Sequence, residues 1–474
     1  MIFKPRDYQT RAIEFILDHP RAALWMQMGL GKTVCALTAI DILRGFDQTS
    51  KVLVIAPKRV ANLTWPDEVT KWDHLRDLGA AKILGSVAQR KRALYDPAPI
   101  HVINYENIPW LLDVLGDSWP YDMVVADEST KLKSHDSVRF RGKSRHVDER
   151  GEVVPAKRGL KHVAGRTKRW LNLTGTPMPK GLHDLWSQFY LLDGGKRLGK
   201  NITAFRNRWF SQNRFGESRE WEPREWAFEE ITDKVKDLVL TLRSADYLDL
   251  PDIIRTRVEV TLPDEVMADY RELEREFYLK LEQHEIVAGN AGVATGKLRQ
   301  YAAGAMYTDD QGNWVGVHNA KIEALESIVD EAGGMPVLVF YNFKSDLDRI
   351  KAAFPQAKEF KDDARLLRDW NAGRIPILLL HPQSAGYGLN LQDGSNICVF
   401  FSLDWSLDAH DQAIERIGPT RQLQSGHPRP VFVYYIMARD TIDELILERL
   451  IERREIQDIL LRKVCTTTMS ERSG

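Results

Sequence analysis

Two short stretches of the sequence combine residue types that could bind and cleave a polyphosphate. The first is residues 28–33, which read MGLGKT. Glycines let backbone N–H groups approach phosphate oxygens, Lys32 would reach the β- and γ-phosphates, and the Thr33 hydroxyl would ligate Mg²⁺. The usual P-loop pattern has a glycine where this chain has Met26, and the alternative is a glycine-rich turn with a surface lysine. The residues predicted to hold the nucleotide here are Met28, Gly29, Leu30, Gly31, Lys32 and Thr33.

The second stretch is a pair of adjacent carboxylates, Asp127 and Glu128, which follows the apolar run at residues 121–126. Ligands of parallel α/β sheets bind outside the carboxyl ends of the strands, where such a pair would lie. We interpret Asp127 as a Mg²⁺ ligand, directly or through water, and Glu128 as the group that orients and deprotonates the attacking water. The alternative is an acidic pair on a solvated loop.

The surrounding pattern predicts the elements that position both stretches. Residues 22–26 are an apolar run, and residues 34–43 carry apolar residues at helical spacing until Gly45. A strand, a glycine loop and a helix N-terminus are therefore expected in that order, and a helix N-terminus favours anions. Further buried strands are expected at residues 51–57, 102–106, 121–126, 171–177, 336–341, 375–381, 397–401 and 430–436.

Two weaker signals lie near these stretches. The amide of Gln9 could read an adenine edge through paired donor and acceptor hydrogen bonds, although alone it would be a surface residue. Thr174, Gly175 and Thr176 close a predicted strand, and their hydroxyls could link nucleotide state to domain movement, although such a sequence alone is merely a turn.

Composition places the chain among globular proteins. Of its 474 residues, 43% are hydrophobic and 28% are charged, and this length suggests roughly three domains. We find no signal peptide and no apolar run long enough to span a bilayer, so an intracellular protein is expected. Three cysteines, at positions 35, 398 and 465, are too far apart to suggest a zinc site or a disulfide framework.

The net charge of −1 conceals a basic segment between Lys131 and Arg169. This segment could contact a polyanion, or it could be a solvated loop. Its basic residues include Arg139, Arg141, Lys143, Arg145, Lys157, Arg158, Lys161, Arg166, Lys168 and Arg169.

Taken in order, GLGKT, DEST, TGTP and a second α/β lobe without its own P-loop resemble superfamily two helicases and translocases, and in particular the Swi/Snf-like branch of the DEAD/DEAH-type ATPases. The resemblance covers nearly the whole chain. It implies an α/β protein with two tandem RecA-like doubly wound parallel-sheet lobes and a helical insertion between them. We expect the first lobe at residues 1–193 with a basic insertion at about 135–165, the helical insertion at 194–317, and the second lobe at 318–474.

The resemblance also assigns residues of the second lobe. Residues 384–391, SAGYGLNL, resemble the motif whose glycines approach ATP and nucleic acid, which points to Gly388. Where the family has two arginines three residues apart, Arg416 matches the first and Pro419 occupies the place of the second. We expect Arg421 to supply the missing charge. The sequence of residues 416–422 resembles that of phage-encoded members of the branch.

The function that the resemblance implies is an ATP-dependent DNA translocase or helicase, which hydrolyses ATP with Mg²⁺ between its lobes and moves along or remodels duplex DNA. Arg139, Arg141, Lys143 and Arg145 would then grip backbone phosphates without reading sequence. Alternatives are an unwinding or branch-migrating helicase on DNA or RNA, and a nucleotide-switched DNA clamp that recruits a partner protein. The expected partners are duplex DNA and a separate nuclease or replication or recombination protein, with no membrane, in the cytoplasm of a bacterial or phage-infected cell.

Overall fold

The computed structural model forms two compact units. The first comprises Met1–Ser211, Trp221–Tyr247 and Glu455–Gly474, and the second comprises Gln212–Glu220 and Leu248–Arg454. Within these ranges the structure describes all residues except 28, 144–145, 148–152, 155–156, 216–217, 251, 283–287, 310, 362, 384–388, 427 and 471–474.

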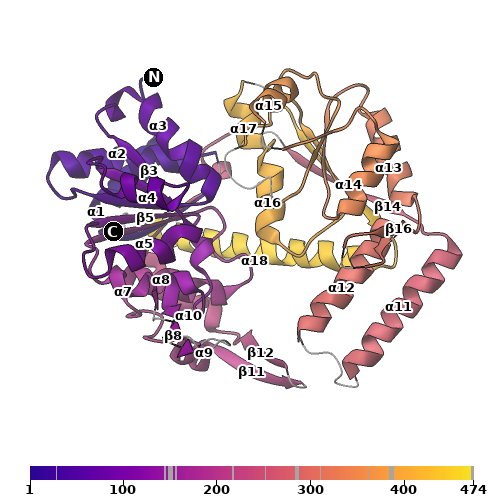
Figure 1. Cartoon of the computed structure of the whole chain (residues 1–474), viewed down its shortest axis with the longest axis horizontal. Coiled ribbons are helices and arrows are strands. Elements are labelled where there is room, and N and C mark those ends of the chain that lie inside the picture. The colour runs from indigo at the N-terminus through magenta and orange to yellow at the C-terminus, as the bar shows by residue number, and fades with distance from the viewer. Residues whose placement is uncertain are drawn as a thin grey trace. The chain divides into compact units, whose positions relative to one another are not determined.

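The first unit is built on a seven-stranded sheet in which every neighbouring pair is parallel (Figure 1). The strand order is β13-β1-β10-β5-β2-β4-β3, which differs from the order along the chain. Most of these strands are buried along their whole length, as the apolar runs predict. The strands are β1 (Arg21–Met26), β2 (Val52–Ala56), β3 (Ala80–Ile83), β4 (Ile100–Asn104), β5 (Met123–Asp127), β10 (Arg169–Thr174) and β13 (Val239–Leu242).

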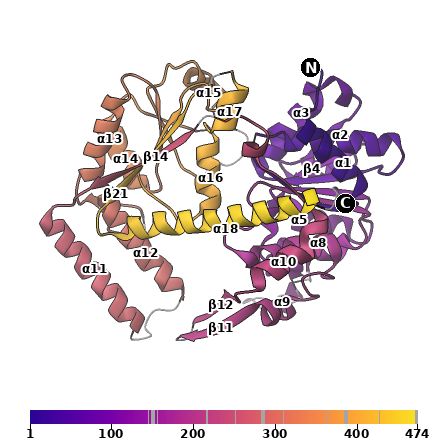
Figure 2. The ribbon, with the colours of Figure 1, turned by 180° about the vertical axis from the view of Figure 1, so that it is seen from behind.

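Helices flank this sheet (Figures 1 and 2). One core cluster joins strand residues such as Trp25 and Trp170 to Phe189 and Leu185 of α8. The helices are α1 (Asp7–Asp18), α2 (Lys32–Gly45), α3 (Trp65–Lys71), α4 (Val87–Leu94), α5 (Ile108–Leu115), α6 (Val138–Arg141), α7 (Lys161–Ala164), α8 (Leu185–Asp193), α9 (Ile202–Trp209) and α10 (Ala227–Val235).

The second unit contains a six-stranded sheet, also parallel throughout, in the order β14-β21-β20-β17-β19-β18. Its strands are β14 (Ile253–Val260), β17 (Val337–Phe340), β18 (Lys358–Glu359), β19 (Ile377–Leu380), β20 (Ile397–Phe400) and β21 (Val431–Ala438). Its helices are α11 (Asp264–Glu282), α12 (Ala288–Ala303), α13 (Ala320–Glu331), α14 (Lys344–Ala353), α15 (Ala364–Asn371), α16 (Leu407–Glu415) and α17 (Pro419–Gln424), and α18 (Ile442–Ser470) begins here. The predicted α/β class with two parallel sheets is confirmed.

Short two-stranded sheets lie outside the two main sheets. In the basic insertion, β6 (Gly142–Lys143) pairs with β9 (Lys157–Arg158), and β7 (His146–Val147) pairs with β8 (Val153–Val154). The other pairs are β11 (Phe210–Phe215) with β12 (Ser218–Pro223), and β15 (Ala305–Tyr307) with β16 (Trp314–Gly316).

The segment at residues 194–317, predicted as a helical insertion, contains α9 to α12 but also contributes an edge strand to each sheet. β13 pairs with β1 in the first sheet, and β14 pairs with β21 in the second. The sequence did not reveal these strands, because β13 has only four residues and β14 is mostly exposed with charged side chains. The bounds of the three domains expected from the sequence stay a prediction.

Within the described part of the chain, no helix combines the length and the apolar character that a bilayer crossing requires.

Candidate active site

The glycine loop joins the end of β1 to the start of α2, as the sequence predicts. Gly29 and Gly31 have φ angles of 82° and 90°, and Gly31 is the residue that precedes the first turn of α2. Lys32 and Thr33 are the first two residues of the helix, and both are partly exposed. The Lys32 ammonium donates a hydrogen bond to the carbonyl of Met26 at 2.7 Å. The loop thus presents a helix N-terminus beside a lysine, which suits an anion.

Gln9 lies against this loop. Its Nε2 donates to the carbonyl of Leu30 at 3.0 Å, and its Oε1 accepts a hydrogen bond from the backbone N–H of Arg6 at 3.0 Å. A Cβ placed on Gly31 would lie 2.7 Å from Gln9 Nε2. The structure therefore brings Gln9 together with Leu30 and Gly31, whereas Met28 lies outside the described residues.

The sheet order brings three predicted motifs to the same edge. β10 lies between β1 and β5, and in the parallel register Trp25 pairs with Thr174 while Leu173 pairs with Asp127. The glycine loop after β1, the TGTP turn after β10 and the carboxylates at the end of β5 therefore follow three adjacent strands. In parallel α/β sheets ligands bind at this carboxyl edge.

Glu128 is held by the threonines around it. The Thr174 hydroxyl donates to Glu128 Oε1 at 2.9 Å, and the Thr130 hydroxyl contacts the same oxygen at 3.4 Å. Thr174 Oγ1 in turn accepts a hydrogen bond from the backbone N–H of Thr176 at 3.0 Å. The turn that contains Thr174, Gly175 and Thr176 is therefore connected directly to the carboxylate of Glu128.

Asp127 is buried and has an aromatic hydrogen-bond donor. Its side chain is 9% exposed, and its Oδ2 accepts a hydrogen bond from the indole N–H of Trp65 at 2.8 Å. Burial raises the pKa of the Asp127 carboxyl, while the Trp65 hydrogen bond and the Lys32 ammonium act in the opposite direction. The sequence does not reveal this contact, because a tryptophan in a helical pattern carries no signal for a carboxylate partner.

A buried glutamine joins the turn after β5 to the TGTP turn. The Gln188 Oε1 accepts a hydrogen bond from the Ser129 hydroxyl at 2.7 Å, and its Nε2 donates to the carbonyls of Pro177 and Asp184, both at 2.8 Å. Gln188 is not among the site residues that the sequence predicts. Its signal is a polar residue within the apolar helical run of α8, where a buried amide requires hydrogen-bond partners.

The two predicted arginines of the second unit meet at one backbone carbonyl. Arg416 is fully buried, and its Nη1 contacts the carbonyl of Leu389 at 3.4 Å. Arg421 Nη1 donates to the same carbonyl at 2.8 Å and to the side-chain oxygen of Asn390. Pro419 is the first residue of α17. This position tolerates proline, which lacks a backbone N–H, because an N–H there would have no partner within the helix. Gly388, next to Leu389, lies outside the described residues.

The basic insertion carries ion pairs that the sequence does not reveal. Arg139 Nη2 lies 3.5 Å from Glu106 Oε1, and Arg141 Nη1 lies 3.0 Å from Asp136 Oδ1. Arg158 donates from both Nη atoms to the two carboxylate oxygens of Asp117, at 2.5 and 3.1 Å. Two of the four predicted phosphate-binding residues thus have a carboxylate neighbour, and exposed pairs of this kind are weak, at about 0–1 kcal/mol. The side chain of Lys143 and the whole of Arg145 lie outside the described part.

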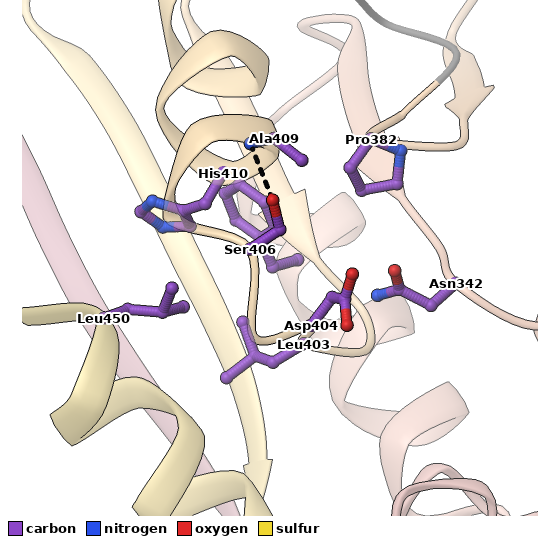
Figure 3. A pocket seen from close by; sticks show the side chains of 9 residues that line it. Asn342, Pro382, Leu403, Asp404, Ser406, Ala409, His410 and Leu450 are labelled. Carbon is purple, nitrogen blue, oxygen red and sulfur yellow. Dashed lines mark hydrogen bonds between the residues drawn. The ribbon is translucent and has the colours of Figure 1, made fainter. Parts of the chain in front are cut away.

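A small pocket in the second unit lies beside Asp404 (Figure 3). Figure 3 shows Asp404 and Asn342 facing one another, with Ser406 hydrogen-bonded to the backbone N–H of Ala409. The cavity of about 10 Å³ has room for roughly one water molecule. It is too small to hold a nucleotide.

The donor set at the first unit's sheet edge fits Mg²⁺ bound together with phosphate. Thr33 and Asp127 would supply hydroxyl and carboxylate oxygens, which are the ligands that this hard cation prefers. Among the described residues, no group of three or more His, Cys, Asp or Glu side chains could hold a metal alone. Mg²⁺ usually binds through one or two protein oxygens plus substrate phosphates and water, so this sparse set is sufficient.

Comparisons with known proteins place the chain in a family. A family model described as "SNF2-related domain" matches residues 8–306, which is more than half of the chain. The chain is 46% identical over 463 residues to "Putative protein p41" of Acyrthosiphon pisum secondary endosymbiont phage 1, and the match covers 97% of this chain and 98% of that protein.

Two more distant likenesses are also found. The chain is 22% identical over 511 residues to the "ISWI chromatin-remodeling complex ATPase ISW1" of Saccharomyces cerevisiae, a match that covers 97% of this chain but 40% of that protein. It is 20% identical to a solved structure titled "Sulfolobus solfataricus SWI2/SNF2 ATPase core in complex with dsDNA", with a TM-score of 0.45 and coverage of 98% of this chain and 95% of that one. The family match over residues 8–306 confirms the resemblance predicted from the motifs, and the chain belongs to the SNF2-related domain family.

Proposed function

We propose that the protein is a DNA-dependent ATPase that moves along or remodels duplex DNA. The observation that carries this proposal is the gathering of Lys32, Asp127, Glu128 and Thr174 at the carboxyl edge of three adjacent parallel strands. Membership of the SNF2-related domain family supports ATP as the nucleotide. The name of the yeast relative, a chromatin-remodeling ATPase, supports DNA as the partner.

Each residue of the first unit has a distinct proposed role in nucleotide binding. The backbone N–H groups of Gly29, Leu30 and Gly31 and the ammonium of Lys32 bind the phosphates. Thr33 and Asp127 hold Mg²⁺, which neutralises phosphate charge when it is bound.

Glu128 is the proposed base for hydrolysis. It accepts the proton of the attacking water, and the hydrogen bond from Thr174 holds its carboxylate in one orientation. Because Thr174 belongs to the TGTP turn, a movement of that turn would change the position of the base. This connection supports a coupling role for Thr174, Gly175 and Thr176.

Gln9 is proposed to contact adenine, which requires it to exchange its present bonds to Leu30 and Arg6 for bonds to the base.

Contacts to DNA are proposed for the basic insertion. The ion pair of Arg141 is exposed and that of Arg139 is partly exposed, so DNA phosphates can replace Asp136 and Glu106 at little cost. Such contacts supply affinity without sequence specificity. The proposed cargo of the motor is a separate nuclease or a replication or recombination protein.

The proposed activity is tested by steady-state ATP hydrolysis with wild type and with Glu128→Gln. Each protein is assayed without nucleic acid, with single-stranded DNA, with duplex DNA and with RNA. We expect duplex DNA to stimulate the wild type strongly, and we expect Glu128→Gln to lose turnover while it still binds ATP, since the substitution removes the base and keeps the size of the side chain. Stimulation by RNA or single strands alone would favour an unwinding helicase.

A second candidate function is a nucleotide-switched DNA clamp that recruits a partner and hydrolyses ATP slowly. Pro419 in place of the second arginine favours this candidate, because a weaker cation at the γ-phosphate slows turnover. The same assay separates the two candidates. ATP-dependent DNA binding without stimulated turnover would support the clamp and contradict the motor.

A further inference from the structure

We propose that Trp65 and Tyr105 are positioning residues for the Asp127–Glu128 pair, and that each controls a different part of it. Trp65 orients the carboxylate of Asp127, and Tyr105 holds the backbone turn that presents Glu128. This pair of roles rests on the nucleotide site proposed above.

Trp65 is placed to fix the side chain of Asp127. It is the first residue of α3, follows a short π-helical turn (Val60–Thr64), and is fully buried. A buried indole N–H requires an acceptor, and here that acceptor is Asp127 Oδ2 at 2.8 Å. Hydrogen bonds to an ionised carboxylate are strong, so this bond restrains the carboxylate and occupies one of its two oxygens.

Tyr105 is placed to fix the backbone at Glu128. Its hydroxyl lies 2.8 Å from the carbonyl oxygen of Asp127 and 3.2 Å from that of Glu128, and the side chain is 1% exposed. Glu128 has φ 60° and ψ 57°, a left-handed conformation that a non-glycine residue adopts only at a cost in free energy. Because buried carbonyls also require donors, the phenol hydroxyl stabilises this turn.

The two aromatic residues support the pair from one side of β5. Trp65 follows β2 and Tyr105 follows β4, and the sheet order is β10-β5-β2-β4. Thr174 at the end of β10 supports Glu128 from the other side. Packing alone would not require the polar atom of each aromatic side chain to meet the pair, so the positions of these polar atoms indicate a positioning role.

Four variants test this inference, because the first unit offers a matched control for each residue. Trp65→Phe removes the indole donor to Asp127. Its control is Trp72→Phe, which removes an indole hydrogen bond to Glu68 Oε2 of 2.5 Å that does not involve Asp127 or Glu128. Tyr105→Phe removes the hydroxyl, and Tyr121→Phe removes another buried hydroxyl, which lies 2.9 Å from His101 Nδ1.

Two measurements separate the roles. The first is the equilibrium affinity of a fluorescent ATP analogue, with Mg²⁺ and with EDTA. For Trp65→Phe we expect about a tenfold loss of affinity in Mg²⁺ and no change in EDTA. The second is kcat for ATP hydrolysis, which we expect Tyr105→Phe to lower about tenfold without a change in affinity.

Both control variants should match the wild type in both measurements. The inference is overturned if Trp65→Phe and Tyr105→Phe match their controls, or if both lose affinity equally with and without Mg²⁺. If Trp65→Phe does not fold, the test rests on Tyr105→Phe, which keeps the aromatic ring. A lower kcat with unchanged ATP affinity in that variant supports the inference, and an unchanged kcat overturns it. A wild type that binds no nucleotide would instead refute the proposed function.

Discussion

At the scale of single residues, the left-handed backbone at position 31 of the glycine loop favours glycine, and an added side chain would also displace Gln9. Gly31 has a φ of +90°, and a Cβ there would lie 2.7 Å from Gln9 Nε2. Gly45, the last residue of α2, has no heavy atom within 4 Å of its added Cβ. The same substitution should therefore destabilise the protein at Gly31 but not at Gly45.

We predict that Gly31→Ala lowers the free energy of unfolding by about 1–3 kcal/mol and weakens ATP binding. Gly45→Ala should change stability little or raise it by at most about 1 kcal/mol. Chemical denaturation and nucleotide titration of both variants provide the check. Equal stability of the two variants would show that the conformation of Gly31 is not constrained as described.

The arginines of the second unit make another residue-scale prediction. Arg416 and Arg421 both contact the carbonyl of Leu389, and burial lowers the pKa of the Arg421 guanidinium. If Arg421 supplies the charge missing at Pro419, Arg421→Ala should lower stimulated ATP turnover by about 10³-fold or more. Steady-state hydrolysis at saturating ATP measures this effect. Near-normal turnover in Arg421→Ala, together with loss of turnover in Arg416→Ala, would exclude Arg421 from this role.

At the scale of elements, Gln188 connects α8 to the turns that follow β5 and β10. Gln188→Leu would leave the Ser129 hydroxyl and the Pro177 carbonyl without their present partner. We predict a loss of about 1–3 kcal/mol in the free energy of unfolding. Adding Ser129→Ala should recover part of this loss, because removing both partners of a buried hydrogen bond is nearly neutral. Urea unfolding of the single and double variants gives the coupling energy between Gln188 and Ser129. Strictly additive changes in the free energy of unfolding would contradict a direct hydrogen bond between these two residues.

The positive charge of the basic insertion can be lowered or raised by substitution, and its effect on DNA binding can be measured in both cases. Replacing Arg139, Arg141, Lys143 and Arg145 by Gln should flatten the dependence of DNA affinity on salt, by about 0.9 in slope for each phosphate that the variant no longer neutralises. Asp117→Asn, which removes the carboxylate paired with Arg158, should steepen it. Titrations of duplex DNA at several salt concentrations measure the slopes. Slopes equal to that of the wild type in both variants would place the DNA-binding surface elsewhere.

At the scale of the whole molecule, buried histidines make stability depend on pH. Burial lowers the pKa of His183 in the first unit and of His318 in the second to about 4, and lowers that of His410 well below its usual value. Below pH 6.5 the unfolded chain therefore binds more protons than the folded protein. The stabilisation is complete above that pH and is lost as the pH falls towards 4.

We predict that the free energy of unfolding falls between pH 7 and pH 5, by about 2 kcal/mol for His318 alone. His318→Gln should flatten this dependence, because an amide does not titrate and can still donate to the carbonyl of Tyr301, which His318 Nε2 contacts at 3.1 Å. Denaturant unfolding of the wild type and the variant at several pH values measures how the free energy of unfolding depends on pH. An unchanged pH dependence in the variant would mean that His318 titrates alike in both states.

Local spacing in the sequence determined much of this protein. The strand, loop and helix around Lys32, the strand before Asp127 and the two α/β lobes were predicted, because apolar periodicity, glycines and helix starts act over a few residues. The sequence did not predict the edge strands β13 and β14, whose pairing partners are distant in sequence, nor the short strands β3 and β18. The catalytic and binding roles of the predicted site residues stay predictions.

The tertiary structure alone decided what holds the site. Trp65, Tyr105 and Gln188 have no local signal for their partners, since each meets its partner across 22 to 62 residues of chain. The reason is the strand order β1-β10-β5-β2-β4, which is not the order along the chain. Packing of the sheet sets which strand ends are neighbours, and those neighbours then determine which buried donors meet the carboxylates of Asp127 and Glu128.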